Sequence, residues 1–222
     1  MRASLATAVL LAALALPLAA QQDSTAHSHD DPDHPAAGGG AVPAGWSVRA
    51  DRGDASGASI TEQGGGLHVV TGPAIILYRA DKTGKGPFHT LAKFTQTKPS
   101  AHAEGYGLFF GGQSLDGKAE QYTYFLIRQD GSYLVKQRDG EKTTDVTKGW
   151  VTSPAVKKPG ADGMSTNLLE VDHKKDPSKF RFLVNGQEVY STDAKAMQAD
   201  GGVGLRVNHN LDVRVEGFDV HR

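Results

Sequence analysis

Runs of alternating apolar and polar residues, separated by Gly, Asp, Asn and Pro, fill the chain from residue 46 onward. A period of two is typical of a half-buried β-strand, because successive side chains of a strand point to opposite faces. About a dozen such runs with short connections predict an all-β sandwich or barrel. The segment 151–166 is interrupted by two prolines and two glycines, and we expect a long loop there. The expected strands are SITE, LHVVT, AIILYR, FHTLAKF, GYGLFF, QYTYFLIR, SYLVKQR, NLLEV, KFRFLV, QEVYST, GVGLRV and LDVRVEGFDV.

Two turns are marked by the pairs Asp130-Gly131 and Asn185-Gly186, each of which stands between two strand-like runs. Asp-Gly and Asn-Gly readily adopt the positive φ angles of a type I′ turn, which joins two strands through a two-residue loop. We therefore expect two β-hairpins. In the second hairpin this register places Phe182 opposite Val189.

The register of the first hairpin predicts which side chains share a face. A two-residue loop places Arg128 opposite Tyr133, while Phe125 and Ile127 point to the other face, where we expect the core. Tyrosine rings stack on the apolar faces of sugars, and Arg and Gln side chains bond sugar hydroxyls. The alternative is ordinary packing of cross-strand aromatic side chains. The candidate ligand-binding residues on this face are Tyr122, Tyr124, Arg128, Tyr133 and Gln137.

The last two strands cannot form a simple hairpin. A two-residue turn at 209–210 would pair Val207 with Asp212 and so mix apolar and polar faces. We expect either a three-residue turn or a crossing of the chain to the other sheet. Gly217 adds a residue before Phe218, which predicts a β-bulge.

The first residues have the composition of a secretory signal peptide, with Arg2, an apolar run and small residues near Ala20. We expect residues 1–20 to be removed, 21–44 to be a disordered His/Asp/Gly-rich linker, and 45–222 to form the β-sandwich. The protein would then be secreted or periplasmic. No later apolar run is long enough to cross a membrane as a helix. Because the chain has no cysteine, its core must stabilise it without disulfides.

The linker also contains the side-chain types that bind zinc, copper or nickel. One interpretation is a metal-capturing tail. We favour a polar spacer, because a metal site needs pre-organised geometry and the neighbouring glycines and prolines supply none. The side chains in question are His27, His29, His34, Asp30, Asp31 and Asp33.

Charge excludes one class of partner. The 24 basic and 25 acidic side chains are nearly balanced, and no basic stripe predicts nucleic-acid binding. No serine nucleophile elbow, HExxH motif, phosphate loop or dinucleotide-binding glycine motif is present.

Several elements follow one another in a characteristic order: GYGLFFGG at 105–112, YTYFLIRQDGSYLVKQR at 122–138, Trp150, NLLEV at 167–171, FRFLVNGQEV at 180–189 and GGVGLRVNHNLDVRVEGFDV at 201–220. Taken in this order, they resemble a concanavalin A-like (laminin-G-like) domain, a two-sheet antiparallel jelly roll. The chain is also similar to secreted bacterial domains called 3-keto-disaccharide hydrolase domains. The resemblance implies a sandwich that binds carbohydrate on one face or on its loop rim, in some cases with calcium.

Catalytic jelly-roll enzymes carry an E-x-D-x-E or E-x-D-x-x-E strand, and the nearest match here is Glu170-Val171-Asp172. Lys174 or Lys175 stands where the second glutamate is expected, which argues against that kind of retaining glycosidase. Glu170 and Asp172 still share one strand face about 7 Å apart, close enough to flank a glycosidic bond. These two acids and His209 are therefore the alternative acid–base candidates.

Two further polar clusters lie on expected loops, His102 with Glu104, and His209 with its flanking asparagines and Asp212. Each is a candidate for bonding a sugar or a metal, and each is also typical of a turn built on His and Asn side chains.

Three functions follow as hypotheses. The leading one is an exported, non-catalytic sandwich that binds a glycan or another cell-envelope component. The second is a glycoside hydrolase or lyase acting on a modified (3-keto) disaccharide. The third is a structural domain that packs against a protein partner. The oligomeric state is left open.

Overall fold

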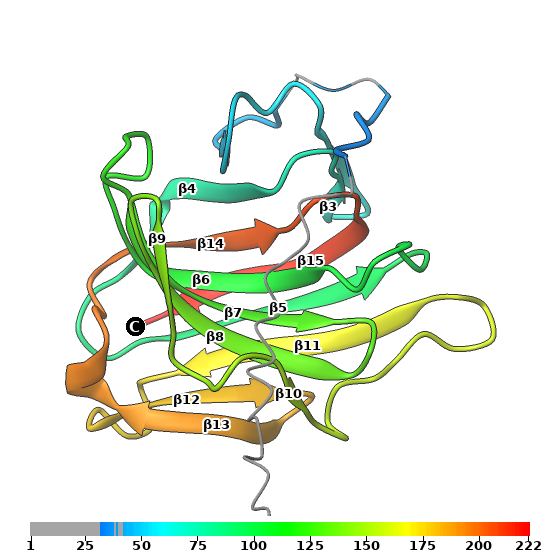
Figure 1. Ribbon diagram of the computed structural model, residues 1–222. Coiled ribbons are helices and arrows are strands. Elements are labelled where there is room, and N and C mark those ends of the chain that lie inside the picture. Colours follow the sequence, from blue (N-terminus) through cyan, green and yellow to red (C-terminus); the bar gives the residue numbers. More distant parts are fainter. Residues whose placement is uncertain (1–31, 38, 40–41) are drawn as a thin grey trace, which may run out of the picture. The chain divides into compact units, whose positions relative to one another are not determined.

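The strands of this protein form two antiparallel sheets, which Figure 1 shows as two layers. The computed structural model describes residues 32–37, 39 and 42–222, and Asp33–Arg222 form one unit. Sheet A has the order β1 (Ser47–Ala50), β4 (Ile75–Gly84), β14 (Gly201–Val207), β6 (Gly105–Gln113), β7 (Gln121–Arg128), β8 (Ser132–Asp139) and β10 (Val151–Thr152), with β9 (Lys142–Asp145) paired to β8. Sheet B has the order β13 (Gln187–Asp193), β12 (Lys179–Val184), β11 (Ser165–Asp172), β5 (His89–Gln96), β15 (Asp212–His221), β3 (Gly66–Val70) and β2 (Ser59–Gln63).

The predicted all-β, two-sheet architecture is confirmed. The only helical element in the described part of the chain is one 3₁₀ turn, η1 (Ala194–Ala196), and none of its helices is long and apolar enough to cross a membrane. The expected loop is bounded by strands at both ends, β10 before it and β11 after it. The predicted signal peptide, residues 1–20, and most of the predicted linker lie outside the described residues.

Phenylalanine rings from both sheets fill the space between them. Phe110 on β6 packs against Phe180 on β12, with ring centroids 4.9 Å apart, and against Phe88 at 5.9 Å. All three side chains are fully buried. Because Phe110 belongs to sheet A and Phe180 to sheet B, these contacts hold the two layers together.

The register predicted for the first hairpin is wrong by one residue. Arg128 pairs with Ser132, so three residues form the loop, not two. A type I′ turn needs a positive φ at both central residues. Only Gly131 has one, at 88°, while Asp130 accepts hydrogen bonds from the Ser132 N–H and hydroxyl at 3.1 and 2.5 Å. The side chains of β8 are therefore turned over relative to the prediction, and Tyr133 faces the core.

The second hairpin has the predicted loop but not the whole predicted register. Asn185 and Gly186 have φ angles of 52° and 77°, as a type I′ turn requires. A bulge beside Phe182 then shifts the pairing, so Phe182 lies opposite Tyr190 and not opposite Val189.

The end of the chain follows the sequence-based expectation. β14 belongs to sheet A and β15 to sheet B, so the chain does cross between sheets after Val207. The pairing of β15 with β5 shifts between Glu216 and Asp219, which confirms the bulge at Gly217. Gly217 has a φ of 64°, a conformation that glycine adopts without strain.

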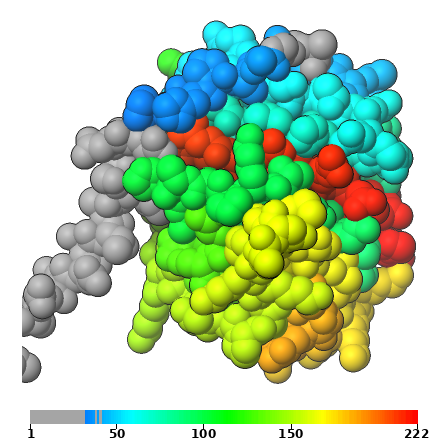
Figure 2. Space-filling view, turned by 90° about the vertical axis from the view of Figure 1, so that its right-hand side faces the viewer, coloured from blue at the N-terminus to red at the C-terminus, as the bar shows by residue number. Residues whose placement is uncertain are grey.

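Contacts with the sandwich begin before the predicted domain start at residue 45. The His34 N–H donates to Asn210 Oδ1 at 2.8 Å, and the Ala36 N–H donates to the Gly57 carbonyl at 2.8 Å. Figure 2 shows this blue segment lying against the cyan part of the chain. Part of the predicted linker is thus packed on the domain.

Candidate functional site

A buried arginine lies in the middle of the outer face of sheet A. Arg206 on β14 points away from the core, because its neighbours Leu205 and Val207 point into it. Arg206 is only 5% exposed, and it donates from Nη1 and Nη2 to the two carboxylate oxygens of Asp51 at 2.9 and 2.6 Å. Bidentate pairs of this kind are both strong and geometrically specific.

Two more arginines and a glutamate extend this pair. Arg138 on β8 contacts both acids, with Nη1 3.1 Å from Asp51 Oδ2 and Nε 2.7 Å from Glu120 Oε1. Arg49 on β1 donates to the other oxygen of Glu120. The set has three guanidiniums and two carboxylates, a formal excess of one positive charge. We call Arg49, Asp51, Glu120, Arg138 and Arg206 the arginine cluster.

Two tyrosines contact the arginine cluster. The Tyr122 hydroxyl accepts a hydrogen bond from Arg206 Nη1 at 2.8 Å, and the Arg206 guanidinium carbon lies 4.9 Å from the centre of the Tyr124 ring. Further along this face, the Arg128 guanidinium stacks over Trp150 at 4.4 Å. Cation–π contacts of this kind hold both guanidiniums in fixed positions.

Two hydrogen-bond donors on this face have no acceptor. Within the part of the chain that the structure describes, Arg206 Nε and Trp150 Nε1 are buried and make no hydrogen bond. Both groups are donors only, and an unpaired buried donor costs free energy.

Burial and ion pairing change the pKa values of Asp51, Tyr122 and Arg206. Burial raises the pKa of the Asp51 carboxyl, but Arg206 and Arg138 outweigh burial and lower this pKa to about 2. Burial raises the pKa of the Tyr122 hydroxyl to about 12, although Arg206 opposes the change. Burial lowers the pKa of Arg206, but Tyr122 and Asp51 outweigh it and hold that pKa well above its ordinary value. Near pH 7 Asp51 and Arg206 are therefore charged, and the Tyr122 hydroxyl is neutral.

The structure brings together three of the five ligand-binding candidates. Tyr122, Tyr124 and Arg128 lie on the outer face of sheet A, as expected from the alternation along β7. The two tyrosines are only 3% and 5% exposed, so they are packed among neighbouring side chains and do not form the open platform that the sequence predicted.

Tyr133 and Gln137 lie on the inner side of the sheet because of the register shift described above. The Tyr133 ring packs in the core, and its hydroxyl donates to the Val189 carbonyl at 2.7 Å. Gln137 donates to the Ala196 carbonyl of η1 at 2.9 Å. Neither residue shares a face with Tyr124.

The three acid–base candidates do not form one site. Glu170 and Asp172 lie on the outer face of sheet B, where Glu170 contacts His89 Nε2 at 3.0 Å and Asp172 contacts Arg181 at 3.2 Å. His209 lies in the connection between β14 and β15, 2.8 Å from Glu104. Glu170 and Asp172 do share one face of β11, as predicted, while His209 lies in a different part of the fold.

The arginine cluster was not identified from sequence. Its members come from β1, β8, β14 and two loops, and no local motif links them. The available signal was the parity of β14, where Arg206 interrupts an otherwise apolar run. An arginine on the outer face of a strand is normally exposed to solvent. The alternation along β14 therefore did not predict that the Arg206 side chain is buried.

No metal site is evident in the described residues: none of their His, Asp and Glu side chains form a group of three or more that could hold an ion. His209 does lie between carboxylates, with Asp33 3.5 Å from its Nδ1. Of the metal-ligand candidates in the linker, His27, His29, Asp30 and Asp31 lie outside the described residues. Calcium binding stays a prediction.

The comparisons with known proteins identify the fold. No protein-family model matches the sequence, and no curated protein matches it. Among solved structures, the carbohydrate-binding module CBM66 from Bacillus subtilis matches with a TM-score of 0.59 and 11% identity, over 80% of this chain and 96% of the module. The metal-free carbohydrate recognition domain of Emp46p matches with a TM-score of 0.51 and 11% identity, over 80% of this chain and 88% of that domain. The predicted jelly-roll sandwich is confirmed, while the similarity to 3-keto-disaccharide hydrolase domains stays a prediction.

Proposed function

We propose that this chain is an exported, non-catalytic carbohydrate-binding domain whose site is the outer face of sheet A. The observation that carries the proposal is the arginine cluster beside Tyr124, on the same face as the stacked pair of Arg128 and Trp150. Buried ion pairs contribute little net stability compared with apolar packing, so their presence on an outer sheet face calls for another reason. Sugar hydroxyls both donate and accept hydrogen bonds, which matches carboxylates and guanidiniums set side by side.

The stacked pair of Arg128 and Trp150 supports the same ligand class. A sugar would pack its apolar face beside the partly exposed indole ring. Arg128, stacked on that ring and also partly exposed, is placed to bond a sugar hydroxyl. The two structural neighbours named above are both described as carbohydrate-binding domains, which agrees with this assignment.

The non-catalytic part of the proposal is based on Asp51. A general acid must carry a proton near the working pH, and a carboxyl with a pKa of about 2 does not. Its two arginine partners, Arg206 and Arg138, also occupy the oxygens that a nucleophile would need.

Affinity electrophoresis in gels containing cellulose derivatives, levan, dextran, xylan or pectin tests the site. We expect at least one polysaccharide to retard the protein, and Arg128→Ala and Trp150→Ala to weaken that binding about tenfold or more, because each removes a central contact. Arg181→Ala, which removes an arginine from the outer face of sheet B, is the matched control and should bind normally.

Two outcomes would count against this proposal. Equal binding by the wild type and both outer-face variants would exclude the site. Release of new reducing ends or keto sugars from the bound polysaccharide, detected by chromatography, would show that the domain is an enzyme.

Export is tested by expressing residues 1–222 in a Gram-negative host. We expect protein recovered from the periplasm or medium to begin at Gln21, as measured by intact mass, because the apolar run and the small residues near Ala20 direct cleavage there. A chain that lacks residues 2–20 should stay in the cytoplasm. Recovery of the unprocessed chain from the cytoplasm would contradict export.

A further inference from the structure

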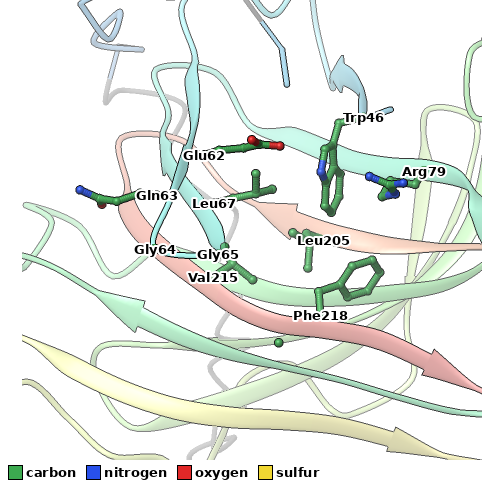
Figure 3. A pocket seen from close by; sticks show the side chains of 12 residues that line it. Trp46, Glu62, Gln63, Gly64, Gly65, Leu67, Arg79, Leu205, Val215 and Phe218 are labelled. Atoms are coloured by element: carbon green, nitrogen blue, oxygen red, sulfur yellow. The ribbon is translucent and has the colours of Figure 1, made fainter. Parts of the chain in front are cut away.

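A pocket of about 420 Å³ opens between the two sheets, at the end of the sandwich where β1, β2 and β3 lie. Figure 3 shows its side chains: Trp46 and Phe218 face one another, with Leu67, Leu205 and Val215 around them. None of these belongs to the arginine cluster, and Leu205 points to the opposite side of sheet A from Arg206. The pocket is thus separate from the outer face of sheet A.

The irregular backbone of β15 builds one wall of this pocket. Up to Val215 the apolar side chains of β15 alternate regularly, and the bulge at Gly217 then changes which side chain faces inward. A bulge commonly re-aims a side chain. Here it brings the Phe218 ring to Trp46, at a centroid distance of 5.8 Å. The two rings, with their planes tilted by 41°, form the aromatic wall of the pocket, and both remain partly exposed.

The rim of the pocket carries one charge of each sign. Glu62 and Arg79 lie on either side of Trp46 in Figure 3, and the Arg79 guanidinium lies 5.9 Å from the indole centre. Arg79 forms an ion pair with Asp81, and its Nε lies 2.9 Å from Asp81 Oδ1. A carboxylate and a guanidinium facing one pocket suit a neutral ligand with several hydroxyl groups better than a charged ligand.

The turn between β2 and β3 leaves the pocket mouth open. Gly64 and Gly65 have φ angles of 60° and 81°, and no atom lies within 4 Å of where a side chain would begin. Glycine permits a ligand to approach the backbone closely. The turn therefore adds backbone N–H and C=O groups to the polar rim.

We propose that this pocket is a second saccharide site, which binds one neutral pyranose ring with the ring's apolar face against Trp46 and Phe218 and its hydroxyls bonded by Glu62 and Arg79. The volume lies within the usual range for small-molecule sites, about 300–1,000 Å³. Glucose-type pyranosides suit the aromatic wall, because their ring hydrogens are axial and leave both faces apolar. The pocket does not require the outer face of sheet A to bind.

The chain provides its own reporters, because it has two tryptophans, one at each proposed site. In Trp150→Phe the fluorescence comes from Trp46, and in Trp46→Phe it comes from Trp150. We would titrate each purified variant with methyl β-glucoside and with cellobiose. The pocket proposal predicts a saturable change of fluorescence in Trp150→Phe.

A second substitution tests the rim. Glu62→Ala, made in the Trp150→Phe background, should weaken the binding about tenfold, because it removes a charge-assisted hydrogen bond. Glu216→Ala is the matched control, since Glu216 is an exposed glutamate of β15 that pairs with Lys93 and does not line the pocket. Thermal unfolding confirms that each variant is folded.

The outcomes separate the two sites. If folded Trp150→Phe shows no saturable change with either sugar, or if Glu62→Ala binds as tightly as Glu216→Ala, the pocket proposal is wrong. A response confined to Trp46→Phe would overturn the pocket and leave the outer-face site standing. A response confined to Trp150→Phe would overturn the outer-face site and leave the pocket standing.

Discussion

Asp51→Ala lowers the free energy of unfolding by about 3–5 kcal/mol, which is our expectation for removing one partner from a buried ion pair. Asp51 is the carboxylate that both Arg206 and Arg138 contact, and its side chain is 23% exposed. Without it, Arg206 keeps its charge in a site where burial opposes that charge. Urea denaturation, followed by circular dichroism, measures the loss.

The control for this prediction is Asp81→Ala. Asp81 also pairs with an arginine, Arg79, but its side chain is 60% exposed. Exposed pairs contribute about 1 kcal/mol or less, so we expect a small change. Equal losses in the two variants would mean that burial of the arginine cluster does not determine its energetics.

The pH dependence of stability gives a second test of Asp51. Its pKa falls from 3.8 to about 2 on folding, because Arg206 and Arg138 outweigh the effect of burial. A lowered pKa stabilises the folded state above the unfolded value of 3.8, and this stability is lost as the pH falls toward about 2. The shift corresponds to about 2 kcal/mol. Asp51→Asn should remove this part of the acid transition, and an unchanged transition would contradict the assignment.

Phe110→Ala should destabilise the protein by about 3–5 kcal/mol, because it deletes a fully buried ring and leaves a cavity between the sheets. The ring contacts Phe88 and Phe180, so both sheets lose packing at once. Urea denaturation again measures the change. Met164→Ala is the control, because Met164 is 42% exposed and its removal should have little effect. A loss below about 1 kcal/mol for Phe110→Ala would show that the two sheets are not held together by this cluster.

The hydrophobic pattern predicted the elements well because it is a local property. Strand alternation, the Asn185-Gly186 turn and the bulge at Gly217 each depend on a few neighbouring residues. The pattern left the connection after Val207 open between a three-residue turn and a crossing, and the sheet order shows the crossing. The first hairpin shows where local reasoning fails. Asp-Gly is compatible with loops of two or three residues, and the hydrogen bonds of Asp130 to Ser132 accompany the longer one.

The one extra residue in the loop of the first hairpin changed which side chains share the candidate site. With the three-residue loop, Tyr133 and Gln137 turn to the inner side of sheet A, while Tyr122 and Tyr124 stay outside. The faces to which the side chains of β7 point were predictable, because they alternate along the strand itself. The faces to which the side chains of β8 point were not predictable, because they depend on the length of the loop between β7 and β8.

By itself, the sequence determined an all-β fold and most of its turns, because strand periodicity and turn chemistry are encoded over a few residues. Only the tertiary structure decided the sites. Arg206 meets Asp51 across 155 residues of chain. Trp46, just before β1, meets Phe218 in the bulged part of β15 because these two segments lie at one end of the sandwich. Such meetings follow from sheet order and register, and these depend on the packing of the whole chain.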